Sequence, residues 1–473
     1  MTRLLALVLT AALGAACTLG PDYVRPSIEA PSTYRDVLAA SATATPASLA
    51  DLQWFDLFKD DTLTALVNTA LKQNFDVQIA AERVIQAREQ FGIVRSNQFP
   101  TVEASVGASD ARRSQIGATI LPAGVPPTVG STRVGFNTSW ELDVWGRLRR
   151  LSESARAQYL ATEEARRGII TTLVADVSQT YLSLRALDLQ LEISQRTRGL
   201  AEDNLRLTNL RRERGVATTL DVRQAEQLLF TATGQIASVE RAVAQTENAL
   251  SLLLGQAPGD VARGQSIEAF KAPPEVPAGL PSALLERRPD IRQAEQQLIA
   301  ANAQIGVARA NFFPRITLTG LLGVESRSLT DILTSRAGTW SIAGAAAQPI
   351  FNAGRNKATL RQAESVQRQL VINYQQSIYG ALRDVSDALA GYRKTAEQRA
   401  EQERLVGALR DATRLSTQRY QGGLDSYLQV LDAERNLFRS ELDLAGLRSQ
   451  ELGAIVELYR ALGGGWSEPS VQP

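Results

Sequence analysis

The sequence predicts a mainly α-helical chain that carries four β-strands of the membrane-barrel type and is built from two tandem repeats. Three observations lead to this fold class. Most of the 473 residues belong to an internal repeat, two long stretches contain no proline and have coiled-coil spacing, and several short segments alternate between apolar and polar residues.

The composition excludes several classes of function. The 51 basic and 50 acidic residues leave a net charge of +1, which does not favour a nucleic-acid partner. The chain has no histidine and a single cysteine, so histidine-based catalysis, imidazole metal ligands and an intrachain disulfide are excluded. We expect no metal site and no enzyme activity, although an enzyme using only Asp and Glu remains an alternative.

The N-terminus predicts a secretory signal peptide over residues 1–16. Arg3 precedes an apolar run over residues 4–13, which is too short to span a bilayer as a helix, and small residues follow it. Cys17 then stands where a bacterial lipoprotein signal places its acylated cysteine, although Gly14 replaces the usual apolar residue. We therefore expect lipidation of Cys17. The alternative is an ordinary signal peptide in which this cysteine is incidental.

Residues 17–60 are expected to form a lipid-anchored, extended segment. Four prolines lie within residues 21–46, and proline does not permit a continuous helix. Thr18 follows the cysteine, and lipoproteins that lack aspartate at this place generally go to the outer membrane. Acyl chains on Cys17 would hold the mature chain at a membrane without a spanning helix.

An internal repeat organises the rest of the chain. Residues 76–102 match residues 290–316 at an offset of 214, with ten identities in 27 positions. Farther along, the offset is 208 and the identical pairs include Gly146/Gly354, Gly215/Gly423, Glu226/Glu434 and Phe230/Phe438. We assign the first repeat to residues 61–255, a linker rich in Gly and Pro to 256–280, the second repeat to 281–463 and a tail to 464–473.

Each repeat begins with a helix and continues into two strands. Proline ends the helix at Pro100 and again at Pro314. Apolar and polar residues then alternate from Thr101, from Arg133 and from Arg315, and more faintly around Trp340. This alternation predicts strands with only one face exposed to water, as in a soluble sandwich or a membrane barrel. Strand lengths near ten residues, with tryptophans at the expected interface, favour the barrel.

Four strands cannot close a membrane barrel within one chain. The smallest membrane barrels have about eight strands, and open strand edges are not tolerated in lipid. Closure therefore requires copies of the chain: two copies would supply eight strands and three would supply twelve.

The second half of each repeat predicts long helices. Residues 147–214 and 355–421 contain no proline, and each stretch would extend about 100 Å as a continuous helix. Apolar residues follow the spacing of a coiled coil at Ile170, Val174, Val177, Tyr181 and Leu184, and at Leu229, Ala232, Ile236, Val239 and Val243. A soluble helical rod is the alternative, but it leaves the amphipathic strands and the lipid anchor unexplained. A barrel of strands that continues into a ring of long helices would form a tube.

Several motifs resemble those of the TolC-like outer membrane factor family, and above all its NodT-type efflux lipoproteins of resistance-nodulation-division systems. The resemblance lies in residues 17–26 (CTLGPDYVRP), in residues 280–295 with their RRPDI sequence, in residues 312–314 (FFP) and in residues 349–355. It implies a homotrimer with a 12-stranded β-barrel on a 12-helix α-barrel, located in the cell outer membrane and extending into the periplasm.

The resemblance also implies a function. The chain would be the outer-membrane channel subunit of a tripartite efflux pump, a passive conduit for small toxic compounds such as drugs, solvents or metal ions. Its partners would be a periplasmic adaptor protein and an inner-membrane resistance-nodulation-division transporter. It would need no cofactor other than the covalent lipid. The alternative is the outer-membrane channel of a type I protein secretion system.

The resemblance places the working residues at the turns between the long helices. The turns would dock the adaptor at Gly215, Gly422 and Gly423. The periplasmic gate would consist of Arg419, Tyr420, Asp425 and Asp432, with Arg419 and Tyr420 tying helices together and the two aspartates forming acidic rings. A second interpretation of Asp425 is that its side chain caps the helix that follows it.

Overall fold

The computed structural model describes residues 18–28, 49, 58–114, 116, 122, 124, 126–270 and 283–464. The chain forms two compact units: unit 1 comprises Met1–Ser27, Val84–Thr162 and Ala294–Tyr374, and unit 2 comprises Ile28–Arg83, Glu163–Gln293 and Gln375–Pro473. The predicted signal peptide, Cys17 and parts of the predicted anchor segment, linker and tail lie outside the described residues.

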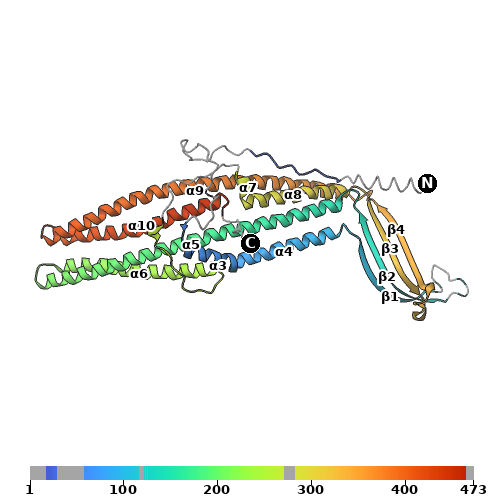
Figure 1. Ribbon diagram of the computed structural model, residues 1–473, viewed down its shortest axis with the longest axis horizontal. Helices are drawn as coiled ribbons and strands as arrows, with labels where there is room; N and C mark the ends of the chain where they lie inside the picture. Colours follow the sequence, from blue (N-terminus) through green and yellow to red (C-terminus); the bar gives the residue numbers. More distant parts are fainter. Residues whose placement is uncertain are drawn as a thin grey trace. The chain divides into compact units, whose positions relative to one another are not determined.

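Unit 1 contains a single antiparallel sheet whose strands lie in chain order (Figure 1). The strands are β1 (Thr101–Arg112), β2 (Thr128–Leu142), β3 (Arg315–Ser326) and β4 (Gly338–Ala347). Two 3₁₀ turns, η4 (Leu329–Asp331) and η5 (Ser335–Ala337), separate β3 from β4. The predicted strands are confirmed, but β2 begins earlier than the alternation indicates, because its polar first residues pair with the end of β1.

The register of the sheet gathers its apolar residues on one face. Val106 pairs with Val134, which pairs with Val324, and Leu322 pairs with Trp340. Paired residues share a face of a sheet and successive residues alternate, so the even-numbered side chains of all four strands lie together. This face is uncovered in the single chain: Trp340 is 73% exposed. The opposite face is polar and carries an Arg133–Glu325 ion pair of 2.7 Å.

A short junction joins the sheet to the helices of unit 1. Gly146 adopts a left-handed conformation (φ 73°) after β2, and α5 (Arg147–Glu213) begins at the next residue. The Asp143 carboxylate accepts hydrogen bonds from the backbone N–H groups of Leu148 and Arg149, each at 2.9 Å, and so caps the first turn of α5. The Trp145 ring stacks on Phe313 with 4.8 Å between centroids.

Residues 18–25, which we call the N-terminal strap, lie along α5 and α8 (Pro289–Ala310) in unit 1. The strap backbone bonds to Trp145 O through Leu19 N–H (3.2 Å), and the Asn302 side chain donates to Pro21 O (2.9 Å). Glu295 of α8, whose side chain is only 9% exposed, binds the Arg25 guanidinium at 2.6 Å and 2.7 Å. The strap is therefore an ordered part of unit 1.

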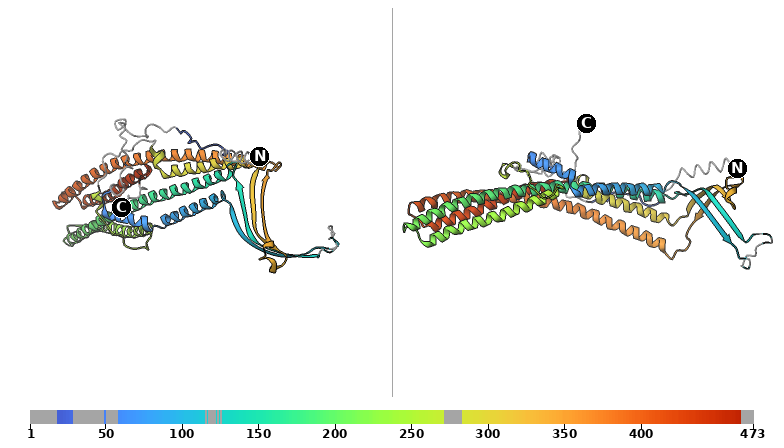
Figure 2. Two further views of the ribbon diagram at one scale, coloured as in Figure 1. Left: turned by 45° about the vertical axis from the view of Figure 1, so that its right-hand side comes forward. Right: turned by 90° about the horizontal axis from the view of Figure 1, so that it is seen from below.

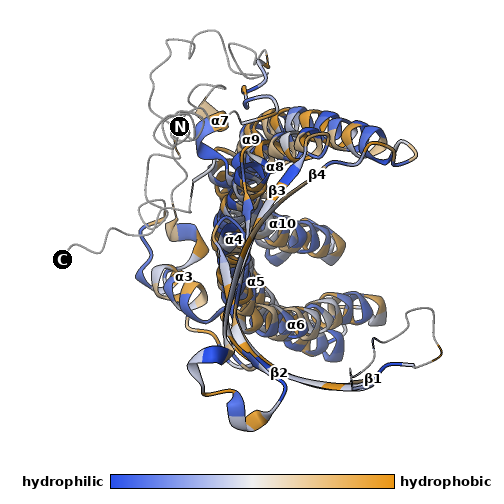
Figure 3. Ribbon diagram, turned by 90° about the vertical axis from the view of Figure 1, so that its right-hand side faces the viewer, coloured by the Kyte–Doolittle hydropathy of each residue, from blue (hydrophilic) through white to orange (hydrophobic). Residues whose placement is uncertain are grey.

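Unit 2 contains the paired long helices. The helix α5 continues from unit 1 and turns into α6 (Thr219–Leu253), and α9 (Arg355–Gln421) likewise turns into α10 (Tyr427–Ala461) (Figure 2). Their helical prediction is confirmed almost to the residue, since each long helix fills its proline-free stretch. The predicted coiled-coil positions Val177, Tyr181 and Leu184 are fully buried. Hydrophilic and hydrophobic residues share the circumference of α6 and α10 (Figure 3).

Shorter helices complete the two units. They are α3 (Asp61–Gln73), α4 (Phe75–Ser96), η2 (Ile267–Ala269) and α7 (Leu284–Arg287). The helix α8 begins at Pro289, within the RRPD sequence, and proline is favoured at the first position of a helix. Among the helices of the described residues, none is long and apolar enough to cross a membrane.

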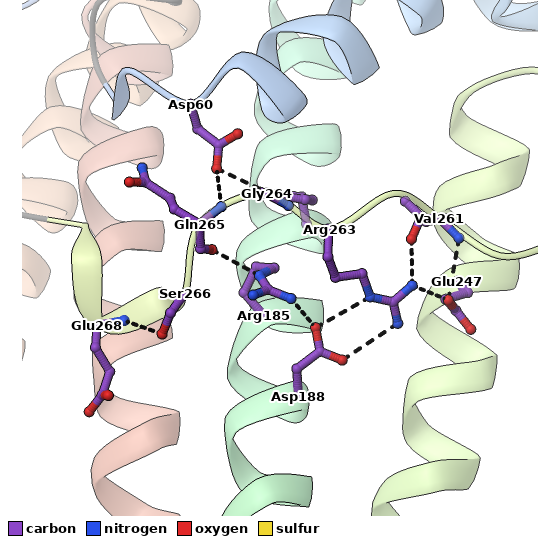
Figure 4. A network of polar contacts seen from close by, with 11 residues as sticks. Asp60, Arg185, Asp188, Glu247, Val261, Arg263, Gly264, Gln265, Ser266 and Glu268 are labelled. Atoms are coloured by element: carbon purple, nitrogen blue, oxygen red, sulfur yellow. Dashed lines mark hydrogen bonds and ion pairs between the residues drawn. The ribbon is translucent and has the colours of Figure 1, made fainter.

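A polar network in unit 2 holds residues 261–268, which follow the first repeat (Figure 4). The Asp60 carboxylate caps α3 through Thr62 N–H (2.8 Å) and accepts a hydrogen bond from the Tyr181 hydroxyl (3.2 Å). That hydroxyl in turn accepts from Gly264 N–H at 2.9 Å. Burial raises the pKa of Tyr181 to about 12, so the hydroxyl stays neutral at physiological pH. Arg263 joins the network to Glu247 and Asp188.

Candidate gate at the helix turns

The α5–α6 turn is closed by backbone geometry and by a capping box. Gly215 has φ 75°, a conformation that glycine adopts without strain, and Val216 N–H bonds to Arg211 O at 2.8 Å. The Thr218 hydroxyl accepts from Asp221 N–H, and the Asp221 carboxylate accepts from Thr218 N–H at 2.7 Å. Gly215 therefore lies where the sequence places it, at the turn between two helices.

The α9–α10 turn has the same backbone but different side-chain chemistry. Gly423 has φ 74°, and Gly422 N–H bonds to Gln418 O at 3.0 Å. The helix α10 begins after Ser426, whose side chain makes no capping hydrogen bond. Asp425 does not supply the cap either, so the capping interpretation of this residue has no support in the structure.

Asp425 instead binds Arg419 across the turn. The Arg419 Nε and Asp425 Oδ2 atoms are 2.5 Å apart, and a second contact of 3.1 Å joins Nη2 to Oδ1. Hydrogen bonding to the guanidinium lowers the pKa of Asp425 below the ordinary aspartate value. The bidentate pair ties the end of α9 to the start of α10, and the Asp425 carboxylate is neutralised by its own chain.

Tyr420 connects three helices. The guanidinium carbon of Arg211, near the end of α5, lies 4.5 Å from the centre of the Tyr420 ring. The ring also contacts Tyr427 of α10, with 5.4 Å between centroids. Sequence reasoning missed Arg211 and Tyr427. The repeat carried a signal for Arg211, because its counterpart at an offset of 208 is Arg419.

Asp432 is not part of this cluster. It lies on the exposed side of α10, where its carboxylate accepts a hydrogen bond from Asn436 at 3.2 Å. The structure thus brings together three of the four predicted gate residues and leaves Asp432 facing solvent in the single chain. The gate and docking roles of these residues stay predictions, and Cys17 is outside the described residues.

An apolar core joins the helices next to the turns. Ala201 of α5, Leu228 of α6 and Phe438 of α10 are buried together with neighbours that extend the cluster: Ile193, Ala225, Ala232, Tyr427, Val430, Leu431 and Ala445. Such a core holds the two helical hairpins against each other through apolar packing. The turns are therefore supported by packing within one chain.

Charged side chains of the described residues were compared with the requirements of a metal site. No group of three or more His, Cys, Asp or Glu side chains among them is placed to hold a metal ion. Unit 2 has a cavity of about 670 Å³ lined by charges of both signs, including Asp176, Arg288, Asp384 and Arg460. Within this lining, Arg288 forms ion pairs with Asp384 at 3.1 Å and with Asp290 at 2.7 Å.

Comparison with known proteins agrees with this geometry. A family model described as outer membrane efflux protein matches residues 66–256 and 280–464. The chain is 39% identical to the solvent efflux pump outer membrane protein SrpC of Pseudomonas putida over 454 residues, covering 95% of this chain and 96% of that protein. It is 36% identical to the probable outer membrane lipoprotein SilC of Salmonella typhimurium, with coverage of 96% and 97%.

A solved structure gives the same result for the fold. The open-state crystal structure of the MtrE outer membrane channel of Neisseria gonorrhoeae superimposes with a TM-score of 0.85 at 32% identity, covering 95% of this chain and 99% of that chain. These similarities, together with the amphipathic sheet and the paired helices, show that the chain is an efflux channel of the outer membrane and belongs to the outer membrane efflux protein family.

Proposed function

We propose that the chain is the outer-membrane subunit of a tripartite efflux pump and acts as a passive conduit for small toxic compounds. The observation that carries the proposal is the four-stranded sheet, which has one uncovered apolar face and two edge strands, β1 and β4. Lipid does not tolerate open strand edges, so these edges call for copies of the same chain.

Three copies are the number we propose. They would supply twelve strands and close the barrel by pairing β1 of one copy with β4 of the next. The polar face, with Arg133 and Glu325, would then line a water-filled lumen while Val106, Trp340 and Ile342 face lipid. Relatives named for solvent, toluene and antibiotic efflux support small toxic compounds as the cargo.

The conduit needs energy from its partners. Transport would be driven by an inner-membrane transporter of the resistance-nodulation-division type, joined through a periplasmic adaptor that docks at Gly215, Gly422 and Gly423. The Arg419–Asp425 pair and the Tyr420 contacts would hold the turns in a narrow arrangement that docking relaxes. The chain itself would perform no covalent chemistry.

We also propose that lipidated Cys17 anchors the subunit. The first described residue after it, Thr18, contacts Gly146 at the junction of sheet and helix: a methyl group added to Gly146 would come within 2.7 Å of the Thr18 side chain. Thr18 is thus held at the junction of sheet and helix. Loss of lipid labelling in a Cys17→Ser variant would be the expected result, and retained labelling would contradict the assignment.

An in-cell crosslink from the α9–α10 turn tests the proposed function. A photoreactive residue would replace Ser426, whose side chain makes no capping bond, and the trapped proteins would be identified. Arg404, 76% exposed along α9 and away from the turn, is the matched control position. We expect an adaptor of a resistance-nodulation-division pump at Ser426 and little at Arg404.

Other outcomes would change the assignment. Capture of an adaptor from an ATP-driven protein exporter would move the function to type I secretion. Equal capture at both positions would refute docking at the turns. Crosslinked species of two rather than three copies would refute the proposed barrel.

A further inference from the structure

The helix α10 presents a heptad-spaced polar stripe to its neighbours in unit 2. Tyr427, Glu434 and Glu441 follow each other at intervals of seven residues, so they lie on one side of the helix. Each of the three contacts another long helix through a hydrogen bond, an ion pair or a ring. We call the contact between α5 and α10 along this stripe the α5–α10 seam.

Glu441 shows how a buried carboxylate is stabilised in the seam. Its side chain is only 6% exposed and forms ion pairs with Arg196 of α5 and, at 2.8 Å, with Arg410 of α9. Two guanidinium groups offset the cost of removing this charge from water. Glu441 therefore joins α10 to both neighbouring helices.

Glu434, one heptad closer to the turn, has no such support. One of its carboxylate oxygens accepts a hydrogen bond from the Asn204 amide of α5 at 2.8 Å. The other oxygen is buried and has no hydrogen-bond partner within the part of the chain that the structure describes. A buried carboxylate that is not fully hydrogen-bonded or paired is costly when ionised.

The groups around Glu434 do not offset its charge. The seam contributes the neutral Asn204 amide from α5 and the Tyr427 hydroxyl from α10, while Asp221 of α6 lies near that hydroxyl and adds negative charge. Burial raises the pKa of Glu434 above the ordinary glutamate value, and the Asn204 hydrogen bond only partly opposes it.

We propose that Glu434 is a proton-responsive latch of the α5–α10 seam, which closes when this carboxyl is protonated and loosens when it is ionised. A protonated carboxyl carries no charge to desolvate and can donate a hydrogen bond as well as accept one. The seam ends at the Tyr420–Tyr427 contact, so its loosening would also ease the gate. That last consequence, and only that one, rests on the proposed gate function.

The direction of the pH effect follows from the raised pKa. In the open seam water solvates Glu434, and its pKa returns to about 4.3, the ordinary value. The closed seam binds the proton more tightly, so the stabilisation is complete below that pH and is lost as the pH rises through the raised pKa. Acidification should therefore tighten the seam.

The repeat supplies a matched control. Glu226 occupies the same place in α6 as Glu434 in α10, at the offset of 208. It forms an ion pair of 2.8 Å with Arg223 one turn earlier, and the Arg223 side chain is largely exposed. Replacing Glu226 by glutamine removes the same charge from the equivalent position outside the seam.

Hydrogen exchange on the full-length protein in detergent tests the latch. Exchange of the amides over residues 427–438 would be followed from pH 5 to pH 8 and corrected for its intrinsic pH dependence. A tenfold change in an opening equilibrium corresponds to each unit of pKa difference, and we expect opening to increase by about threefold or more at pH 8. Glu434→Gln should abolish this increase and stay protected, whereas Glu226→Gln should behave as the unaltered chain does.

A second variant keeps the test decisive if Glu434→Gln does not fold. Asn204→Asp places a second carboxyl beside Glu434, and the pair should hold a proton to higher pH, which shifts the midpoint of opening upward. Opening that is independent of pH in the unaltered chain, a Glu434→Gln variant that keeps the response, or an unchanged midpoint in Asn204→Asp would each overturn the latch. Bilayer conductance is a separate readout: a pH-dependent seam with pH-independent conductance would support the latch and contradict the gate.

Discussion

Replacing Arg25 by alanine should release the N-terminal strap from unit 1, and should do so more strongly than replacing its partner Glu295. The two residues form a bidentate ion pair, but they are not equally buried. The Arg25 side chain is 43% exposed and the Glu295 side chain only 9%. Loss of Arg25 leaves a buried carboxylate, whereas loss of Glu295 returns a partly hydrated guanidinium to water.

The different exposure of Arg25 and Glu295 sets the free-energy cost of each substitution. Removing one partner of a buried pair costs about 3–5 kcal/mol, and the partial exposure of Arg25 favours the lower end, about 3 kcal/mol for Arg25→Ala. We expect about half of that for Glu295→Ala, which leaves no buried charge. Since about 1.4 kcal/mol is a factor of ten, strap opening should rise about 150-fold and about tenfold, respectively.

Hydrogen exchange of the strap amides measures both opening constants. The Leu19 amide is a suitable probe because it bonds to Trp145 O at 3.2 Å. Val24→Ala is the control, because the Val24 side chain is 80% exposed and its truncation should change nothing. If Glu295→Ala opened the strap as much as Arg25→Ala, the unpaired buried charge would not be the dominant cost, and the reasoning would be refuted.

Three further predictions concern unit 2. Thr218→Ala should lower stability by about 1 kcal/mol in chemical denaturation because it removes the capping box of α6, while Ser426→Ala, without a side-chain cap to lose, should be neutral. Gly264→Ala should melt at lower temperature because a Cβ there would lie 2.6 Å from the carboxylate that caps α3, while Gly259→Ala, with its nearest contact at 3.9 Å, should not. The lowered pKa of Asp425 means that its ion pair stabilises the turn above the ordinary aspartate value of about 3.9 and is lost only as the pH falls through the lowered pKa. Hydrogen exchange of the turn amides down to pH 3, in the unaltered chain and in Asp425→Asn, measures this loss. Identical pH profiles of the two proteins would contradict the prediction.

Much of the secondary structure could be predicted from the sequence because its determinants are local. Proline ends the helices before Pro100 and Pro314, glycine permits the turn at Gly215, and alternation marks the strands. The first residues of β2 escaped prediction because Gly, Ser and Thr there show no alternation, and only pairing with β1 makes them a strand.

The candidate site was predicted less completely. The sequence suggested two interpretations of Asp425, and only the tertiary structure decides that it binds Arg419 and caps nothing. The Arg211–Tyr420 contact joins residues more than two hundred positions apart, and no local pattern encodes such a pairing. The buried Glu295 lay within a motif, but its partner Arg25 in the strap was not evident.

Glu226 and Glu434 separate the two kinds of information most clearly. By itself the sequence determined the repeat, the helices that carry both glutamates and the turns before them, because periodicity and backbone limits act over a few residues. Only the tertiary structure decided that Glu226 pairs with a neighbour on its own helix and that the half-buried Glu434 bonds to Asn204 of α5. The physical reason is that ionisation and hydrogen bonding depend on what surrounds a side chain in space, and two identical residues in equivalent positions can meet different neighbours.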